Sequence, residues 1–263
     1  SQRAAFEVSW WETARQAHRP ALPTQFGEMT GLVIALLYFA VLVLAFGLAA
    51  RVRRYWRVPA PLKIATTPAP TTAWGVVLRL FREVAFFESL FRSNKWIWLF
   101  SWMFHAALVL VLLRHLRYFT EPVWTWVVWI QPFGKYAAFA MVIGLAGLWL
   151  RRLVLPRVRY ISQPSDHLML ALLAGIALSG LALQYLARTD IITLKAFSLG
   201  LVRFDWQALP SEPVLLAHLA GVAVLLIVLP FSKLLHIPGI FFSPTRNQTD
   251  NPREQRYVPP GGV

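Results

Sequence analysis

Four of the six histidines lie within or at the ends of long apolar segments, where ionisable side chains are costly and usually functional. His105 and His115 are ten residues apart in one segment, and His218 and His236 are eighteen residues apart in another. The chain has no cysteine, which excludes zinc–thiolate sites, iron–sulfur clusters and covalently attached c-type haem. Histidine therefore remains as the axial ligand available to a haem.

The surrounding composition is that of a membrane protein. Of the 263 residues, 57% are hydrophobic and 14% are charged, and the mean hydropathy is +0.52. An average soluble domain is about 45–50% apolar and about 25% charged. These values exclude an ordinary soluble enzyme, and the abundance of apolar and aromatic residues excludes a disordered chain.

Five segments are long and apolar enough to cross a bilayer, which takes about 20 residues. We predict an all-α integral membrane bundle of five transmembrane helices, over residues 29–50, 96–118, 133–155, 167–187 and 213–236. The segments between the helices that face one side hold 17 lysines and arginines, against nine on the other side. The positive-inside rule then predicts an N-terminus outside and a cytoplasmic C-terminus. The isoelectric point near 11 reflects this topology and contact with anionic lipid, and it does not indicate a nucleic-acid partner.

Three regions follow from this topology. We expect a periplasmic N-terminal tail over 1–28, a membrane domain over 29–240 and a cytoplasmic C-terminal tail over 241–263. A Pro-rich linker over 59–70 leads into 72–91, where the apolar spacing predicts an amphipathic helix on the cytoplasmic face. The polar tail after Pro238 is expected to lack regular structure of its own.

The outer loop before the third predicted helix is rich in tryptophan. Trp124, Trp126 and Trp129 are typical of an aromatic belt at the membrane interface.

Depth in the membrane pairs the four histidines. The second helix runs outward and the fifth runs inward, so His115 lies level with His218 and His105 lies level with His236. Two bis-histidine b-type haems would then lie one near each face. Eighteen residues are five helical turns, whereas ten residues leave His105 and His115 about 80° apart around the helix. The axial rises differ, roughly 15 Å against roughly 27 Å, so the fifth helix must tilt or bend, and Pro230 favours a bend.

Other roles for membrane histidines remain open at this point. A single histidine in a span can be a hydrogen-bonded packing residue or a proton relay, as in a haem-free transporter. The chain shows no internal repeat of the kind usual in transporters, and a passive membrane anchor gives four histidines no purpose. His18 and His167 lack partners of this kind, and His167, beside Asp166, is expected at the interface.

The two spacings and their surrounding strings resemble the gamma subunit family of respiratory nitrate reductase. The matching strings are FHAALVLVLLRH, HLAGVAVLLIVLPFSKLLHI and LRRLVLPRVR, within roughly residues 30–240. The resemblance implies a five-helix cytochrome b of a bacterial or archaeal cytoplasmic membrane. It implies two haem b groups, an inner one ligated by His105 and His236 and an outer one ligated by His115 and His218.

A narrower resemblance is to the membrane cytochrome b (M) subunit of the Dsr complex of sulfur metabolism, in LFRSNKWIWLFSWMFH, RHLRYF and FFSPTRNQTDNPRE. It implies a quinone-reactive oxidoreductase subunit that exchanges electrons between menaquinone, or another quinone, and a cytoplasmic iron–sulfur subunit resembling heterodisulfide reductase. Other membrane subunits and a periplasmic cytochrome c would belong to the complex, and terminal substrate chemistry would lie in those other subunits. The alternative is the membrane subunit of a nitrate reductase or heterodisulfide reductase type complex.

Three basic residues near His115 are further candidates. The family places a lysine about twenty residues beyond the outer haem histidine, and Lys135 has that position, where it would bind a quinone oxygen. An interfacial lysine that snorkels is the alternative. Arg114 stands where the nitrate reductase subunit has a glycine. Arg114 and Arg117 are candidates for pairing with the propionates of the outer haem, or else they anchor the helix end at the interface.

Overall fold

The computed structural model describes residues 27–58, 65, 68–187 and 189–250, and the regular structure in these ranges is entirely helical. Five helices are long and apolar enough to cross a membrane, so the chain is a multi-pass membrane protein. Within the described residues they are α2 (Glu28–Arg57), α5 (Lys95–His115), α6 (Thr125–Val154), α8 (Pro164–Tyr185) and α10 (Pro213–Val228), where 3₁₀ turns extend the second span to Tyr118 and the fifth to Phe231. The all-helical class and the number of spans are thus as predicted. The expected N-terminal tail and most of the Pro-rich linker lie outside the described residues.

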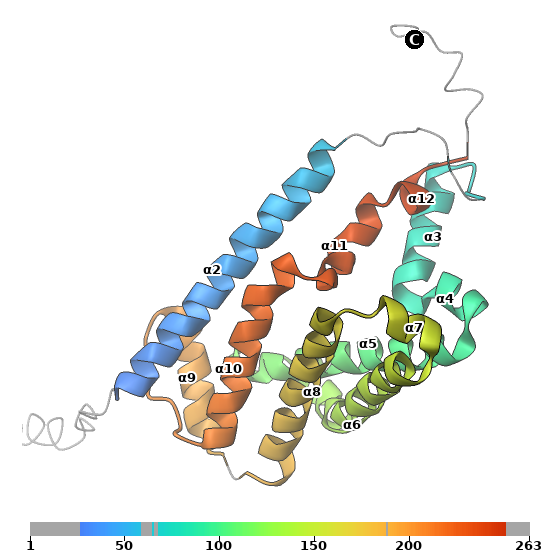
Figure 1. Cartoon of the computed structure of the whole chain (residues 1–263). Coiled ribbons are helices and arrows are strands. Elements are labelled where there is room, and N and C mark those ends of the chain that lie inside the picture. The colour runs from blue at the N-terminus through green and yellow to red at the C-terminus, as the bar shows by residue number, and fades with distance from the viewer. Residues whose placement is uncertain (1–26, 59–64, 66–67, 188, 251–263) are drawn as a thin grey trace, which may run out of the picture.

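The five helices pack as a chain of neighbours and not around one central helix (Figure 1). α5 packs against α6, α6 against α8, α8 against α10, and α10 against α2. The helix α9 (Ile191–Arg203) lies beside the N-terminal part of α2, where the Tyr38 hydroxyl donates a 2.7 Å hydrogen bond to the Leu201 carbonyl. The histidine-bearing helices α5 and α10 therefore belong to opposite parts of the bundle.

Glycines of α6 allow α5 to approach it closely. A Cβ atom at Gly144 would lie 2.9 Å from the Phe104 Cβ, and one at Gly134 would lie 2.8 Å from the Arg114 Cβ. Lipid gives little hydrophobic drive to helix association, so close packing at small residues is a main source of it. The α5–α6 pair is accordingly the most closely packed part of the described chain, with Leu145 and Met141 in its core.

The third membrane helix begins eight residues before its predicted start. The run from Val123 to Gly134 carries no charge, and α6 forms over it from Thr125 with Pro132 inside the helix. Trp126 and Trp129 therefore lie on α6 with exposed rings, and not in a loop as predicted. Only Trp124 precedes the helix, as its N-cap residue.

The fifth helix does not continue to 236 as predicted. α10 ends at Val228, a 3₁₀ turn over Leu229–Phe231 follows, and the backbone at Ser232 is extended. Pro230 has no N–H for the helical ladder, and it is buried against α2, where a Cβ at Gly47 would lie 2.7 Å from its Cβ. The expected bend is therefore a complete break. His218 and His236 do not share a face of one helix, so the five-turn argument was wrong.

The segment predicted as one amphipathic helix over 72–91 forms two helices. α3 (Ala73–Phe86) is capped by Thr72, whose hydroxyl accepts from the Gly75 N–H at 3.1 Å. Phe87 then adopts a left-handed backbone with φ 53°, and α4 (Glu88–Ser93) follows. The apolar spacing continues through Phe87, so periodicity alone could not reveal this turn.

The described part of the C-terminal tail has regular structure, contrary to prediction. α11 (His236–Gly239), a 3₁₀ turn over Ile240–Phe242 and α12 (Pro244–Asn247) lead to α3 (Figure 1). Arg246 donates to Glu83 at 2.8 Å and to the Ser89 hydroxyl at 2.6 Å, so this tail docks on its own chain. An ion pair and a short hydrogen bond hold it where apolar spacing gives no signal.

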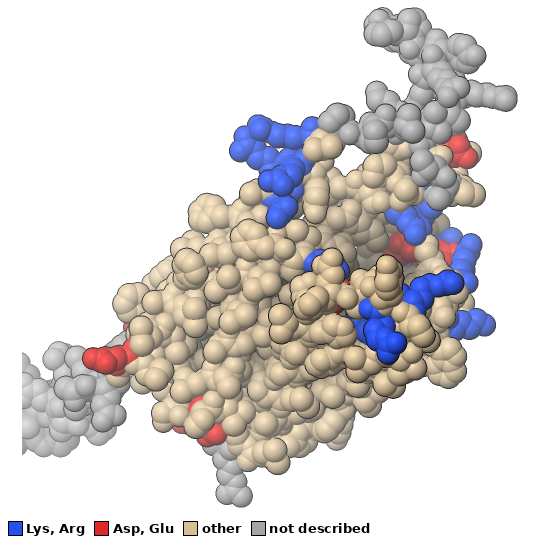
Figure 2. Space-filling model, in the orientation of Figure 1, with Lys and Arg blue, Asp and Glu red and all other residues tan. Residues whose placement is uncertain are grey.

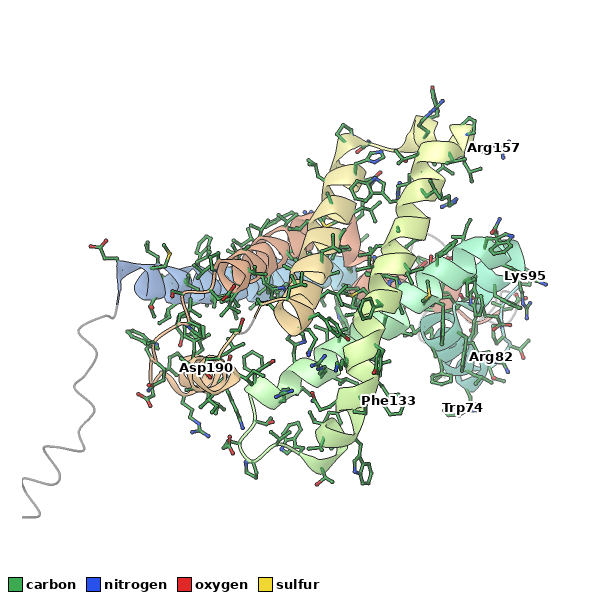
Figure 3. All side chains as sticks on the ribbon, turned by 90° about the horizontal axis from the view of Figure 1, so that it is seen from below. Trp74, Arg82, Lys95, Phe133, Arg157 and Asp190 are labelled. Carbon is green, nitrogen blue, oxygen red and sulfur yellow. The ribbon has the colours of Figure 1, made fainter. Side chains whose placement is uncertain are left out.

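Charged side chains are unevenly distributed over the molecule. In Figure 2 the visible lysines and arginines gather over the C-terminal end of α2 and the region of α4 and α7 (Pro156–Ile161), and the opposite end shows acidic residues. Figure 3 shows Arg82, Lys95 and Arg157 far from Asp190, the N-cap of α9 at the other end. The two ends of the bundle therefore differ in charge.

Candidate haem-ligand site

The first histidine pair, called the outer pair after its expected depth, joins two regular helices. His115 is the last residue of α5, and His218 is in the second turn of α10. Their rings are nearly parallel, at an interplanar angle of 7°, with centroids 6.4 Å apart. Gly180 of α8 lies beside this pair, since a Cβ there would be 3.4 Å from the His218 Cε1.

The second pair, called the inner pair after its expected depth, joins a regular helix to an irregular segment. His105 lies in the middle of α5, and His236 follows the 3₁₀ turn over Lys233–Leu235. Their ring centroids are 5.9 Å apart and their planes are nearly perpendicular, at 83°. The Phe87 ring packs edge-on against His105, with centroids 5.0 Å apart. The structure thus brings together the two pairs that depth in the membrane predicted.

Each of the four rings is held through its Nδ1 atom. Nδ1 of His105 lies 2.7 Å from the Ser101 carbonyl, and Nδ1 of His115 lies 2.7 Å from the Val111 carbonyl. Carbonyl oxygens only accept, so each Nδ1 carries the proton and each Nε2 keeps its lone pair. A metal-ligating histidine commonly donates its other N–H to a carbonyl in this way.

The two remaining rings follow the same rule. Nδ1 of His236 lies 3.1 Å from the Lys233 carbonyl. Nδ1 of His218 lies 2.9 Å from the Ser179 hydroxyl, which itself donates to the Ile176 carbonyl at 2.9 Å. Because the hydroxyl proton is used there, the serine oxygen accepts from His218. All four Nε2 atoms are therefore free to ligate.

The separation of the two rings in each pair fits two histidines on one haem iron. A metal–imidazole bond is about 2 Å long, so two rings that ligate one metal from opposite sides have centroids roughly 6 Å apart. Both observed separations, 5.9 and 6.4 Å, agree with this. In the described part of the chain no three His, Cys, Asp or Glu side chains gather to hold a metal ion. Two protein ligands suffice where a porphyrin supplies four nitrogens.

His167 differs from the four paired histidines. The Trp149 indole N–H donates to its Nδ1 at 3.1 Å, so this nitrogen is the acceptor and Nε2 carries the proton. The ring therefore presents a donor where a ligand needs a lone pair. This agrees with its exclusion from the ligand set, and His18 lies outside the described residues.

Arg114 and Arg117 lie in a polar cluster at the C-terminal end of α5. Gln131 of α6 accepts from both arginines, at 3.3 Å from each donor nitrogen, and Arg114 also donates to Gln184 of α8. The Arg117 guanidinium stacks on Tyr118, 5.3 Å from the ring centroid. The cluster gathers two positive charges next to the outer histidine pair.

Lys135 lies on α6 close to this cluster. It is ten residues into the helix, roughly 15 Å from its start. Its ammonium is 5.6 Å from the centroid of the Tyr185 ring, and Tyr185 directly follows Gln184, a partner of Arg114. Lys135 and Arg114 therefore reach the same end of α8.

Sequence reasoning missed several residues that hold the pairs in place. Ser179 reaches His218 from α8, and nothing in the spacing of α8 marks it. Asp166 was noted only as the neighbour of His167, yet it is buried and binds Lys233. An acidic residue just before an apolar run is the one signal that pointed to it, and it is also the signal of an ordinary helix start.

A bundle of five membrane helices that brings four histidines into two facing pairs defines a multi-pass membrane protein with two candidate haem positions. Residues 84–252, more than half of the chain, match the family model for the nitrate reductase gamma subunit. The chain belongs to the nitrate reductase gamma subunit family. The resemblance found in the histidine spacings is thereby confirmed.

Two relatives are similar over most of their length. The chain is 33% identical to the "Hdr-like menaquinol oxidoreductase cytochrome b-like subunit" of Archaeoglobus fulgidus, over 89% of this chain and 83% of the relative. It is 32% identical to the protein of the same name from Archaeoglobus profundus, over 86% and 81%.

Proposed function

We propose that this chain is a di-haem cytochrome b that exchanges electrons with the membrane quinone pool. His105 and His236 would ligate an inner haem, and His115 and His218 an outer haem. The observation that carries this proposal is the two ring pairs at 5.9 and 6.4 Å, with every Nδ1 held by an acceptor and every Nε2 free. The name of the Archaeoglobus relatives, cytochrome b-like subunits of a menaquinol oxidoreductase, supports the same chemistry.

The charge distribution supports an orientation with the inner pair toward the cytoplasm. The end of the bundle that holds α3, α4, α7 and the C-terminal end of α2 carries most of the described lysines and arginines, and positive segments stay inside. We assign residues 1–28 to the periplasm, 29–240 to the membrane domain and 241–263 to the cytoplasm. The membrane would be a bacterial or archaeal cytoplasmic membrane, with α3 and α4 on its inner surface.

The quinone would bind near the outer pair. Lys135 would supply its hydrogen bond, since an ammonium donates to a quinone oxygen and stabilises negative charge on it. Arg114 and Arg117 would pair with the propionates of the outer haem, which the b-type haem supplies as two carboxylates. Menaquinone, named for the Archaeoglobus relatives, is the favoured quinone.

Bound haem would supply one-electron transfer, which the protein tunes through its axial ligands, burial and nearby charge. We expect a cytoplasmic iron–sulfur subunit resembling heterodisulfide reductase as the electron partner. The "Hdr-like" naming of both relatives supports such an assembly. A Dsr-type complex with further membrane and periplasmic cytochrome c subunits is the most specific version of this proposal.

A haem count with an optical spectrum tests the proposal. The complex is purified first, and this subunit is then isolated from it. A pyridine haemochrome assay on the isolated subunit should give two b-type haems per chain. Acid-acetone should extract both, because the chain has no cysteine for covalent attachment. A subunit without haem would support a proton-relay transporter or a passive anchor, and a ratio near one would contradict the two-pair assignment.

A further inference from the structure

A buried carboxylate lies where three elements meet at the inner end. Asp166, in the first turn of α8, is 8% exposed. Lys233 donates to both of its oxygens, at 2.6 and 2.9 Å, and Arg152 of α6 lies 3.5 Å away. The Gln163 N–H donates to the same carboxylate at 3.1 Å. Asp166 therefore joins α6, α8 and the segment that follows the break in α10.

Lys233 in turn holds His236. Its side chain reaches Asp166, and its backbone carbonyl accepts the Nδ1–H of His236 at 3.1 Å. The contact that fixes the His236 ring is thus made by the same residue that the carboxylate holds. The Nδ1 atoms of the other three paired histidines bond to residues of regular helices. His105 and His115 bond to a carbonyl in the preceding turn of their own helix, and His218 bonds to Ser179 of α8.

The segment needs such a tether because helical hydrogen bonding does not hold it. α10 ends at Val228, and the extended backbone at Ser232 interrupts the ladder between the helix and His236. A 3₁₀ turn of three residues has weak hydrogen-bond geometry of its own. The Ser232 hydroxyl accepts from the Leu234 N–H at 3.2 Å and donates to the Leu229 carbonyl at 3.0 Å, so it joins the two 3₁₀ turns to each other but not to α6 or α8.

We infer that Asp166 and Lys233 are positioning residues for the inner haem ligand, acting through the Lys233 carbonyl on the His236 ring. This inference rests on the proposed function, because it takes His236 as an iron ligand. A carboxylate that holds two cations while buried keeps its charge and stays fixed. The pair therefore sets where the ring sits and how it is turned relative to His105.

Lys233→Ala is the main test. It removes the side-chain tether and leaves the carbonyl that contacts His236. Residues that orient metal ligands typically contribute tenfold to a hundredfold in affinity. The Lys233 side chain is 68% exposed, so solvent screens the pair and we expect the affinity for the inner haem to fall about tenfold. The readouts are retention of the inner haem during dialysis against apomyoglobin and the ferric low-spin electron paramagnetic resonance signal of each haem in the whole complex.

Two further variants separate positioning from folding. Lys233→Arg keeps the cation and should retain the inner haem like the unmodified chain. Asp166→Asn should shift the same inner signal as Lys233→Ala, since it removes the charge that holds the lysine. Lys195→Ala is the matched control, because it breaks the ion pair of Lys195 with Glu121 near the outer end and should leave the inner signal unchanged.

The outcomes distinguish this inference from the proposed function. Loss or reorientation confined to the inner haem in Lys233→Ala, restored in Lys233→Arg, supports it. Two haems with an unchanged inner signal in Lys233→Ala overturn it and leave the proposed function standing. Equal loss of both haems would show a general folding effect and overturn it too. An unmodified complex with fewer than two haems overturns the proposed function and this inference together.

Discussion

The outer and inner histidine pairs serve the same proposed role but are built differently. The outer pair stands on two regular helices, with rings nearly parallel at 7°. The inner pair joins a helix to a 3₁₀ segment, with rings nearly perpendicular at 83°. The outer pair thus rests on regular helices, with the Ser179 side chain of α8 holding one ring, whereas the inner pair also needs side-chain contacts that hold an irregular segment in place.

This structural difference explains how the two histidines of each helix can lie at matching depths although their spacings in the sequence differ. Ten residues separate His105 from His115, and ten residues also separate His218 from Val228, where α10 ends. At about 1.5 Å per residue, each stretch rises roughly 15 Å. The residues between Val228 and His236 do not continue the helix, and they bring the His236 ring to 5.9 Å from the His105 ring. The break thus removes the mismatch that a continuous helix would have imposed.

Removal of a proposed ligand should give the largest effect and the clearest break between the pairs. His115→Ala or His218→Ala should remove the outer haem and leave the inner one, and His105→Ala or His236→Ala should do the reverse. Redox titration of the b-type absorbance in each variant checks this. Loss of the same haem in His105→Ala and His218→Ala would contradict the five-helix arrangement.

The Lys135→Ala variant sharpens the comparison by asking which pair lies near the quinone. Loss of one charged hydrogen bond costs about 1.5–3 kcal/mol, or roughly tenfold to a hundredfold in affinity. Binding of a quinol analogue should weaken by that factor while both haems remain, and Lys135→Arg should fall between because its donor geometry differs. Titration of analogue binding measures it. Unchanged binding would contradict a quinone site at Lys135 and would favour one near His105 and His167.

Ser179→Ala tests the side-chain support of the outer pair. The His218 Nδ1–H loses the hydroxyl that accepts from it. Support of this kind is worth about tenfold or more in metal affinity, so the outer haem should dissociate faster and the inner haem should be unaffected. Ser179→Thr keeps the hydroxyl and is the control. Equal retention in both variants would show that helix packing alone suffices for the outer pair.

Ser232→Ala should have the smallest effect and should fall on the inner pair. The hydroxyl caps the turn that leads to His236, and removal of a serine cap costs about 1 kcal/mol. The inner haem should be retained roughly fivefold less well, with no change at the outer haem. Parallel dialysis of the two variants, Ser179→Ala and Ser232→Ala, shows whether each serine serves its own pair.

Sequence alone could predict the spans and the pairing because both depend on counts along the chain. Apolar length marks a membrane helix, and alternating direction places His115 beside His218 and His105 beside His236. For the segment after Val228 the sequence predicted a bend at Pro230 but not the end of the helix. Pro230 indicates a disturbed ladder, but whether a helix bends or ends depends on what packs against it, here α2 at Gly47.

The supporting residues could not be predicted for a related reason. Ser179 meets His218, and Asp166 meets Lys233, only because of how α8 is rotated and tilted beside α10 and the segment after it. Periodicity gives the direction of a side chain on its own helix but not the rotation of one helix against another. The early start of α6 was not predicted for a simpler reason: the tryptophan-rich stretch before residue 133 was interpreted as an interfacial loop, whereas α6 runs through it from Thr125.

The close packing of α5 on α6 has a consequence for how the molecule is assembled. This tightly packed hairpin carries His105 and His115, one ligand of each pair, and the other two ligands lie on α10 and the segment beyond it. Neither proposed site exists within one half of the bundle alone. Each haem would therefore act as a cross-link between the two halves, and the free energy of binding it would become free energy of folding. A chain deprived of haem should keep the hairpin and lose the register of its other half.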